Sequence, residues 1–466
     1  MNTQYINQHT NSNQKIDNKE EFEILLIDPG IQLKTRSNVK YVNRGLLSIA
    51  TFLRSKGFRT NYFSLDYYIN AGMNEEQVFS EIEKIIKEKD VKISAISNLF
   101  IAETDNVLRI AKFIKERFPE NITVIGGYNP TITNQELIKR EEIDFIIRGE
   151  GEWALLDLVS AIKNGVSTKD IAGLVTKEHI GAERKHGDLR ELPPIDYSIL
   201  PRAYLLSDNP PRVNLEISRG CYHNCTFCSV SQFWHETIRS HNPDKLIHEF
   251  EELKKIGYKG SISLEESMVN LKSEKIKEFL SNAKRFKDEF EFDFIASRYD
   301  FVDDESISLL DEIGFQNLML GLESASKKVL DKINKHIDLE AFIETCKIVK
   351  QHKIRLNVYM IVGLPGETKE TNKETYEFLT KMMNEELIDT VFPCYFQPYH
   401  GTRAREDIKE FGGKILADEK DYFKWLMRDE PLVEYEGLNK KELKEMMNKM
   451  LYLNKEVKNP VIDKLM

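Results

Sequence analysis

Three cysteines in one short segment, R-G-C-Y-H-N-C-T-F-C-S, are the residues of this sequence best suited to chemistry. Cys221, Cys225 and Cys228 have C-x3-C-x2-C spacing, which supplies three thiolates to one metal centre and leaves a fourth position unfilled. A structural zinc site normally has four protein ligands. No fourth cysteine or paired histidine stands at zinc-ribbon spacing here, so the pattern favours an iron–sulfur centre with a vacant position for chemistry.

A mixed cysteine and histidine zinc site is the alternative, because His223 lies inside the loop and His235 and His241 follow it. The flanking pattern favours the iron–sulfur interpretation. Residues 212–218 are predicted to form a buried strand, and residues 243–256 a helix. A strand, a ligand loop and a helix in this order are how an α/β barrel presents a cofactor at the carboxyl ends of its strands.

The cysteine loop resembles that of the radical S-adenosylmethionine (SAM) superfamily, in which C-x3-C-x2-C holds a four-iron four-sulfur cluster and SAM chelates the open iron. Phe227, the aromatic residue directly before the third cysteine, also fits this pattern. The resemblance implies that Cys221, Cys225 and Cys228 ligate the cluster. It further implies that reductive cleavage of SAM gives a 5′-deoxyadenosyl radical, which removes hydrogen from an unactivated carbon.

Composition bounds the function. With 466 residues the chain is long enough for two or three domains, and its 66 Lys plus Arg against 76 Asp plus Glu give a net charge of −10. This balance does not indicate a general surface for nucleic acids or anionic membranes. No apolar run approaches a membrane span, and residues 1–18 are polar rather than a signal peptide, so we expect a cytoplasmic protein.

Short apolar segments alternate with amphipathic ones between residues 22 and 158, which predicts an α/β fold with a parallel sheet covered by helices on both faces. Further strand and helix pairs follow the cysteines, and about six strands suit a partial barrel. We therefore expect the following division: a disordered N-terminus (1–20), a doubly wound Rossmann-like domain (21–190), a proline-rich linker (191–211), a partial (β/α)6 barrel (212–411) and a helical C-terminal region (412–466).

Two strand ends in the first domain are poor in side chains. Ser97-Asn98-Leu99 follows one predicted strand and Gly126-Gly127 follows another, where a large flat ligand can approach the backbone. A lone Gly-Gly is more often a tight turn. Together with Arg148-Gly-Glu-Gly-Glu152, however, the order resembles the cobalamin-binding domain joined to many radical SAM enzymes. In that family an S-x-L segment and a Gly-Gly segment line the nucleotide tail, which implies roles for Ser97, Leu99, Gly126 and Gly127.

One departure concerns the cobalt ligand. Cobalamin domains that place an imidazole under cobalt carry D-x-H-x-x-G, whereas Asp28 is followed here by Pro29 and Gly30 with no histidine nearby. We expect bound cobalamin to have no protein histidine on its lower face. The alternative is a domain that has lost the cofactor and kept the fold.

Polar residues stand at several predicted strand ends of the barrel, where the resemblance implies contacts to SAM. Two glutamates follow the second strand, an arginine follows the third, G-L-E-S ends the fourth and G-L-P-G-E-T ends the fifth. The residues implied for SAM are Glu265, Glu266, Arg298, Glu323, Ser324 and Gly363. The glutamate pair and the arginine have a plainer alternative, which is simple solvation at the surface.

These observations predict a cobalamin-dependent radical SAM enzyme whose most common outcome, by resemblance, is methylation of a carbon radical by methylcobalamin. One alternative is a cobalamin-free radical SAM cyclase, oxidase or rearrangement enzyme. Another is a non-enzymatic cobalamin or metal sensor, which would not need an open iron site. We expect a small-molecule or peptide substrate and a one-electron reductant such as flavodoxin or ferredoxin.

Overall fold

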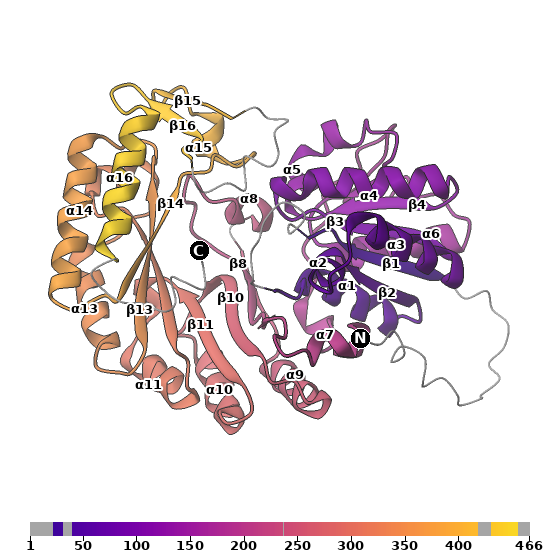
Figure 1. Ribbon diagram of the computed structural model, residues 1–466, viewed down its shortest axis with the longest axis horizontal. Helices are drawn as coiled ribbons and strands as arrows, with labels where there is room; N and C mark the ends of the chain where they lie inside the picture. Colours follow the sequence, from indigo (N-terminus) through magenta and orange to yellow (C-terminus); the bar gives the residue numbers. More distant parts are fainter. Residues whose placement is uncertain (1–21, 31–39, 236, 418–429, 455–466) are drawn as a thin grey trace.

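The computed structural model describes residues 22–30, 40–235, 237–417 and 430–454, so the expected disordered N-terminus lies outside the described residues. Two lobes are visible, each built on a six-stranded sheet (Figure 1). Within the described residues, no helix combines the length and the apolar character needed to cross a membrane.

The first lobe contains a sheet in the order β2-β1-β3-β4-β5-β6, which is parallel except for the last pair. Its strands are β1 (Glu23–Asp28), β2 (Arg59–Ser64), β3 (Val91–Ser97), β4 (Ile122–Gly126), β5 (Phe145–Ile147) and β6 (Leu174–Val175). Its helices are α1 (Arg44–Ser55), α2 (Leu65–Asn70), α3 (Glu75–Lys89), α4 (Thr104–Arg117), α5 (Tyr128–Leu137) and α6 (Gly151–Lys163).

Helices cover both faces of this sheet, which confirms the doubly wound prediction. The apolar stripes of α3 and α4 are buried in one core, and those of α1 and α6 in another that continues into the second lobe. The strand order reverses between β1 and β3. A ligand of such a sheet binds outside the carboxyl ends of the strands at this switch point.

The sequence pattern predicts a helix from Gln135 to Arg140, which is wrong, because α5 begins directly after Gly127 and ends at Leu137. Its first turn contains Asn129-Pro130, a pair that usually indicates a loop. Proline is nevertheless tolerated in the first turn of a helix, where its missing N–H has no intrahelical partner.

The proline-rich connector is packed rather than extended. It contains a short 3-10 turn (Tyr197–Ile199) and a four-residue helix, α7 (Arg202–Leu205), and most of its apolar side chains are buried in the core shared by the lobes. The side chains buried in this core are Ile195, Tyr197, Ile199, Leu200 and Leu205. The connector therefore adds to the contact between the lobes.

The second lobe is a parallel sheet in the order β14-β13-β12-β11-β10-β7, which confirms the partial six-stranded barrel. Its strands are β7 (Val213–Asn214), β10 (Ser261–Val269), β11 (Glu291–Ser297), β12 (Asn317–Glu323), β13 (Arg355–Val362) and β14 (Thr390–Tyr395). Its helices are α9 (Pro243–Ile256), α10 (Glu274–Ala283), α11 (Asp304–Ile313), α12 (Lys327–Lys332), α13 (Leu339–Val349), α14 (Lys369–Asn384) and α15 (Arg403–Glu406).

Two predicted strands differ from those observed. The strand expected over residues 212–218 is split: β7 joins the barrel, while β8 (Ser218–Gly220) pairs with β9 (Ile238–Ser240) in a separate two-stranded sheet. Glu265 and Glu266 lie inside β10, which continues to Val269, rather than after it. The side chains of residues 265–267 are outside the described part of the structure.

The C-terminal region contains the predicted helix, α16 (Lys440–Leu453), and also an antiparallel pair that was not predicted, β15 (Gly413–Ile415) and β16 (Val433–Tyr435). Asn454 satisfies the edge of the barrel sheet. Its Oδ1 accepts from Val391 N at 2.9 Å and its Nδ2 donates to Val391 O at 2.6 Å, as a neighbouring strand would. Edge strands with unpaired backbone groups are usually covered in this way.

Candidate functional site

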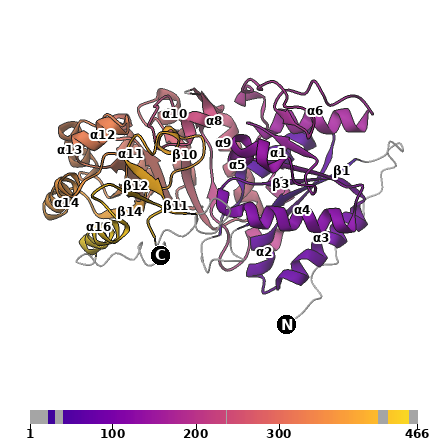
Figure 2. The same ribbon diagram turned by 90° about the horizontal axis from the view of Figure 1, so that it is seen from above.

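The cysteine loop lies between the lobes. It starts at the end of β8 and runs into α8 (Val230–Trp234), which stands between the two lobes in both views (Figures 1 and 2). Cys225 is buried, and Cys221 and Cys228 are partly exposed. Thr226 anchors the loop to the barrel, because its N donates to Ile333 O at 2.9 Å and its O accepts from Ala404 N at 2.8 Å.

The surroundings of the three thiols fit an anionic iron–sulfur cluster. Two buried cations, Lys335 and Arg298, are close enough that their charges act on Cys221 and Cys225. Within the described residues, no three His, Cys, Asp or Glu side chains converge on a position for a single metal ion. A four-iron cluster does not require such convergence, because each cysteine binds a different iron.

Burial dominates the protonation of the three thiols. It raises the pKa of Cys221 and Cys225, and it raises the pKa of Cys228 to about 11. The charges of Lys335 and Arg298 act in the opposite direction on Cys221 and Cys225. Metal binding requires the thiolate form and therefore releases these protons.

Two of the three histidines considered as zinc ligands, His241 and His235, are engaged elsewhere, whereas the buried Nε2 atom of His223 has no hydrogen-bond partner. His241 is buried, with Nε2 2.7 Å from Glu216 Oε1 and Nδ1 3.0 Å from Lys245 Nζ. The Nε2 atom of His235 lies 2.6 Å from Glu183 Oε1. Burial lowers the pKa of His223 to about 4, and its ring packs 5.9 Å from that of Phe301.

Arg298 lies directly after β11, as predicted, and is 7% exposed. Its Nε and Nη2 atoms donate to the carboxylate of Asp300 at 3.0 and 3.2 Å. Its Nη1 atom is buried without a hydrogen-bond partner. A buried donor of this kind is costly to leave unpaired, so this atom is suited to an anionic group such as the SAM carboxylate.

Glu323 ends β12 with a positive φ of 64°, a backbone conformation that residues other than glycine rarely adopt. Its Oε1 accepts from the buried Lys335 Nζ at 3.1 Å, and Lys335 Nζ lies 5.9 Å from the centre of the Phe227 ring. The carboxylate predicted for SAM is thereby linked to the cysteine loop. Strained backbone of this kind persists where the surroundings fix it, often at functional sites.

Gly363 follows β13 with a φ of 91°. Its N donates to Glu367 Oε2 at 2.7 Å, and its O accepts from Tyr435 Oη of β16 at 2.9 Å. Burial raises the pKa of Glu367 to about 8. The C-terminal region therefore helps to hold the turn predicted to contact SAM.

Ser324 is 1% exposed and is bonded within the fold. Its Oγ lies 3.2 Å from Thr375 Oγ1 and accepts from Ser326 N at 3.2 Å. This hydroxyl connects β12 to α14.

The two segments predicted to contact cobalamin lie against each other at the carboxyl edge of the first sheet. Asn98 N donates to Gly126 O at 2.7 Å, and Asn129 N donates to Asn98 O at 3.3 Å. Gly127 has a φ of 117°, and a Cβ there would stand 2.6 Å from Asn98 O. Glycine is therefore required at this position by both its conformation and its neighbours.

Asn43, which precedes α1, links the strands at the switch point of the sheet. Its Nδ2 atom lies 3.3 Å from Asp28 Oδ1 and 3.4 Å from Ser97 Oγ, and its Oδ1 atom caps α1 by accepting from Leu46 N. Leu99 is 45% exposed at this edge. Glu103 holds the same loop by accepting from Leu99 N at 2.6 Å, and burial raises the pKa of Glu103 to about 8.

The carboxyl edges of the two sheets meet at Tyr128, the residue after Gly127. Its Oη donates to His400 O, in the segment after β14, at 3.1 Å. Its ring lies 6.0 Å from that of Phe233 in α8. The two predicted cofactor edges and the helix after the cysteines are thus in contact.

Lys335 and Asn43 were missed by sequence reasoning. Lys335 follows several other lysines in a charged segment, and only the structure shows that it is buried while Lys327 and Lys332 are exposed. Asn43 directly precedes α1, and an asparagine at this place is a usable capping signal. Its contacts with Asp28 and Ser97 depend on the topology.

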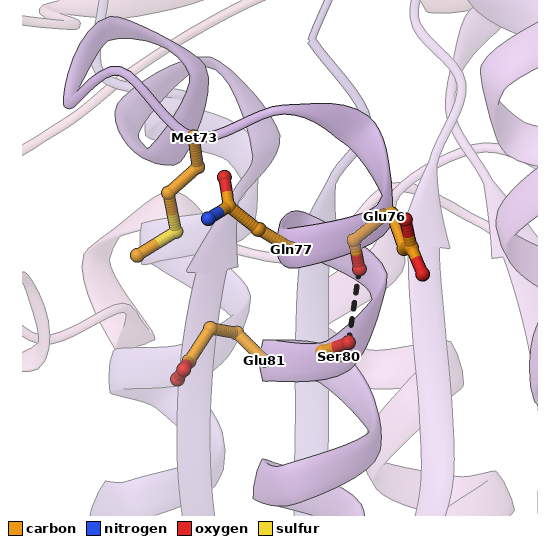
Figure 3. Close-up of a pocket in the computed structure, with 5 residues that line it drawn as sticks. All are labelled: Met73, Glu76, Gln77, Ser80 and Glu81. Carbon is orange, nitrogen blue, oxygen red and sulfur yellow. Dashed lines mark hydrogen bonds between the residues drawn. The ribbon is translucent and has the colours of Figure 1, made fainter.

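A hollow of about 310 Å³ lies on the surface of α3, away from the cysteine loop (Figure 3). Its lining includes Glu76 and Ser80, and the Oγ of Ser80 donates to the backbone O of Glu76 at 3.0 Å. Another, of about 450 Å³, lies on α14. None of the strand-end residues described above lines either hollow.

Comparison with known proteins agrees with this arrangement. The profile of the Radical SAM superfamily matches residues 215–379, and that of the B12 binding domain matches residues 33–159. The chain is 32% identical over 353 residues to an uncharacterised methyltransferase of Pyrococcus horikoshii, covering 73% of this chain and 74% of the relative. It is 30% identical over 342 residues to the anaerobic magnesium-protoporphyrin IX monomethyl ester cyclase of Rubrivivax gelatinosus, covering 71% of this chain and 60% of the relative.

A solved structure with a similar fold is that of the radical SAM methyltransferase TsrM from Kitasatospora setae, which contains cobalamin and a 4Fe-4S cluster. The TM-score is 0.72 at 15% sequence identity, over 94% of this chain and 89% of that one. The chain belongs to the radical SAM superfamily, among its cobalamin-dependent enzymes with methyltransferase relatives, and its cofactors are a four-iron four-sulfur cluster, SAM and cobalamin.

Proposed function

We propose that this enzyme methylates an unactivated carbon and that the reaction takes place where the carboxyl edges of its two sheets meet. The observation that carries this proposal is the contact of Tyr128 with both His400 O and Phe233, which brings the cobalamin edge next to the barrel edge and the cysteine loop. When bound, the cluster supplies an electron to SAM and cobalamin supplies a methyl carrier.

The barrel residues bind and orient the cluster and SAM. Cys221, Cys225 and Cys228 hold the cluster, and the buried charges of Lys335 and Arg298 offset its negative charge. Arg298 Nη1 donates to the carboxylate of SAM, because this donor is buried and unpaired within the fold. Glu323 orients Lys335 and contacts the polar part of SAM, and the Gly363 turn supports its adenine side.

The first lobe binds cobalamin through backbone and small side chains. Ser97, Leu99, Gly126 and Gly127 accommodate the nucleotide tail at the switch point. The segment from residue 10 to residue 178, which includes the Asp28-Pro29-Gly30 turn and all four predicted cobalamin contacts, contains no histidine that could take the lower face of cobalt. Bound cobalamin would therefore have no histidine of this segment on its cobalt.

The substrate is a small molecule or a peptide, and the electron comes from a flavodoxin or ferredoxin. Cobalamin-dependent radical chemistry with an oxygen-sensitive cluster requires a reducing compartment, and we place the enzyme in the cytoplasm. The similarity to a cyclase favours a ring-forming reaction as the second candidate.

Transfer of the labelled methyl group of SAM distinguishes these reactions. The anaerobically reconstituted protein, loaded with cobalamin and reduced, is incubated with methyl-labelled SAM and candidate substrates. We expect label to reach bound cobalamin and then a new carbon–carbon bond in the product. Label on cobalamin with an unmethylated, cyclised product would favour the second candidate. A protein that binds no cobalamin at saturating concentration would contradict both the methylation and the cobalamin assignments.

A further inference from the structure

Arg219, two residues before Cys221, is buried in a group of charged side chains that joins the two lobes. Its Nη1 donates to Glu150 Oε1 at 2.9 Å, and its Nη2 donates to Glu152 Oε1 at 2.7 Å. Its Nε donates to Glu216 Oε1 at 2.7 Å. The side chain of Arg219 is 7% exposed and those of Glu150 and Glu152 are 3% exposed.

Both glutamates are fixed within the first lobe, at the start of α6. Glu152 Oε1 also accepts from Ser48 Oγ of α1 at 2.6 Å. Glu150 Oε2 also accepts from Gly187 N at 3.0 Å. Arg219 is therefore bonded to carboxylates whose positions are set by the doubly wound sheet and its helices.

The far end of the cysteine segment is attached to the same place. β9 pairs with β8, and Arg239 of β9 donates to Glu150 Oε1 at 2.8 Å and to Gly187 O at 2.6 Å. The Trp234 ring of α8 lies 5.9 Å from the Arg219 guanidinium and 5.5 Å from that of Arg239. At Gly220, a side chain would overlap the carbonyl oxygen of Thr237.

The cysteine segment is thus held from two sides. Its base, β8 and β9, is attached to the first lobe through Arg219 and Arg239, whereas Thr226 in its middle is bonded to the barrel. The two strands of the base form their own sheet, separate from the barrel sheet. The position of the cysteines relative to the cobalamin edge therefore depends on the charged group as well as on the barrel.

Glu152 remains negatively charged in this group. Burial alone would raise the pKa of Glu152, but the charge and hydrogen bond of Arg219 bring it below its ordinary value. Replacing a buried ion pair by apolar residues is often neutral for stability, whereas removing one partner leaves an uncompensated charge. In some proteins such pairs fix one arrangement of the groups that they join.

We propose that Glu150 and Glu152 are positioning residues that act through Arg219 to fix the base of the cluster loop relative to the first lobe, and thereby the separation of cluster and cobalamin. This inference rests on the proposed assignment of Cys221, Cys225 and Cys228 as cluster ligands. Neither glutamate needs to touch a cofactor for this role.

The test is a distance measurement on the full-length protein loaded with both cofactors. Dipolar electron paramagnetic resonance (EPR) between the reduced cluster and cob(II)alamin reports their separation. We expect one narrow distribution for the wild type. We expect a distribution at least twofold broader, or a shifted one, for Arg219→Met and for the doubly substituted Glu150→Gln/Glu152→Gln protein.

Glu249→Gln is the matched control, because Glu249 forms another buried ion pair between the lobes, with Arg44 at 2.9 Å, and its remaining hydrogen bonds are to Ile195 N and Tyr197 Oη of the connector rather than to the cysteine segment. It should retain the wild-type distribution. If Arg219→Met does not fold, the single substitution Glu152→Gln carries the test, since it keeps the shape of the side chain.

Wild-type distributions in the Arg219 and Glu150/Glu152 variants would overturn this inference and leave the proposed function intact. The same broadening in Glu249→Gln would also overturn it, because any loosening of the lobes would then suffice. A cluster that survives substitution of all three cysteines would overturn the ligand assignment and this inference together.

Discussion

The two lobes hold their strand-end turns in a similar way but differ in charge. In each lobe a buried glutamate accepts backbone N–H groups of a strand-end turn: Glu103 holds the turn of Leu99, and Glu367 holds that of Gly363. Beside the cysteine loop, however, the barrel edge adds the buried cations Arg298 and Lys335. The first lobe presents glycines, Ser97 and the exposed Leu99 instead.

The difference corresponds to the cofactors. A cluster with three thiolates and the carboxylate of SAM bring negative charge into a buried site, and buried charges need partners. The nucleotide tail of cobalamin is large, and it requires close approach of the backbone, which glycine permits. Each edge therefore suits one kind of cofactor. A substitution at one edge should weaken the binding of that cofactor and leave the binding of the other unchanged.

The largest difference between cluster content and cobalamin binding is expected when the cysteines are replaced. Replacing Cys221, Cys225 and Cys228 together by Ala removes all thiolate ligands, so iron should fall from about four per chain to background. Cobalamin binding should persist, because its residues lie on the other lobe. Iron and sulfide analysis with cobalamin absorption measures both, and full iron content in the variant would refute the ligand assignment.

Gly127→Ala should have the opposite effect, because it should weaken cobalamin binding and leave the cluster intact. A Cβ at this residue would stand 2.6 Å from Asn98 O and would occupy an unfavourable φ of 117°, so cobalamin affinity should fall by at least tenfold, which is about 1.4 kcal/mol. Iron content should be unchanged. Gly165→Ala is the control, because it has a positive φ of 63° but no atom within 4 Å of the added Cβ.

A smaller effect, confined to SAM, is expected for Glu323→Ala. This variant leaves the buried Lys335 Nζ without its acceptor at 3.1 Å, and SAM affinity should fall by about tenfold while iron and cobalamin contents are retained. Asp331→Ala is the control, because its ion pair with Lys327 is exposed and contributes little. Equal SAM affinity in the two variants, measured by calorimetry, would remove Glu323 from the site.

The last effect is on stability rather than on cofactor binding, and it concerns the buried glutamate that each lobe has at a strand-end turn. Burial raises the folded-state pKa of Glu367 to about 8, above its unfolded value, so between about pH 4.5 and 8 the folded protein keeps a proton that the unfolded chain has lost. The free energy of unfolding should therefore decrease as pH rises, by up to about 1.4 kcal/mol per pH unit from this group. Thermal midpoints of the apoprotein from pH 5 to 8 measure this, and Glu367→Gln should show a flatter dependence; an identical slope would contradict it.

The sequence was sufficient for features that depend on local pattern. The C-x3-C-x2-C loop, the doubly wound sheet and the six barrel strands follow from spacing and periodicity. Features that depend on tertiary contacts were missed. Lys335 is indistinguishable in sequence from its exposed neighbours, the strand expected over residues 212–218 is split because Ser218–Gly220 pairs with β9, and α5 begins at a Pro-containing turn that resembles a loop.

The sequence also makes a prediction about the ligand of cobalt. The absence of histidine between residues 10 and 178 predicts that cob(II)alamin on the protein shows an EPR spectrum without nitrogen superhyperfine splitting. Splitting that disappears when one particular histidine is substituted would contradict the prediction.

The most direct test of the central assignment is release of 5′-deoxyadenosine from SAM by the reduced, reconstituted protein, measured by liquid chromatography and mass spectrometry. We expect the wild type to release it slowly even without substrate, and the variant lacking Cys221, Cys225 and Cys228 to release none. Equal release by the two proteins, or none from a wild type that contains four irons and binds SAM, would contradict the account.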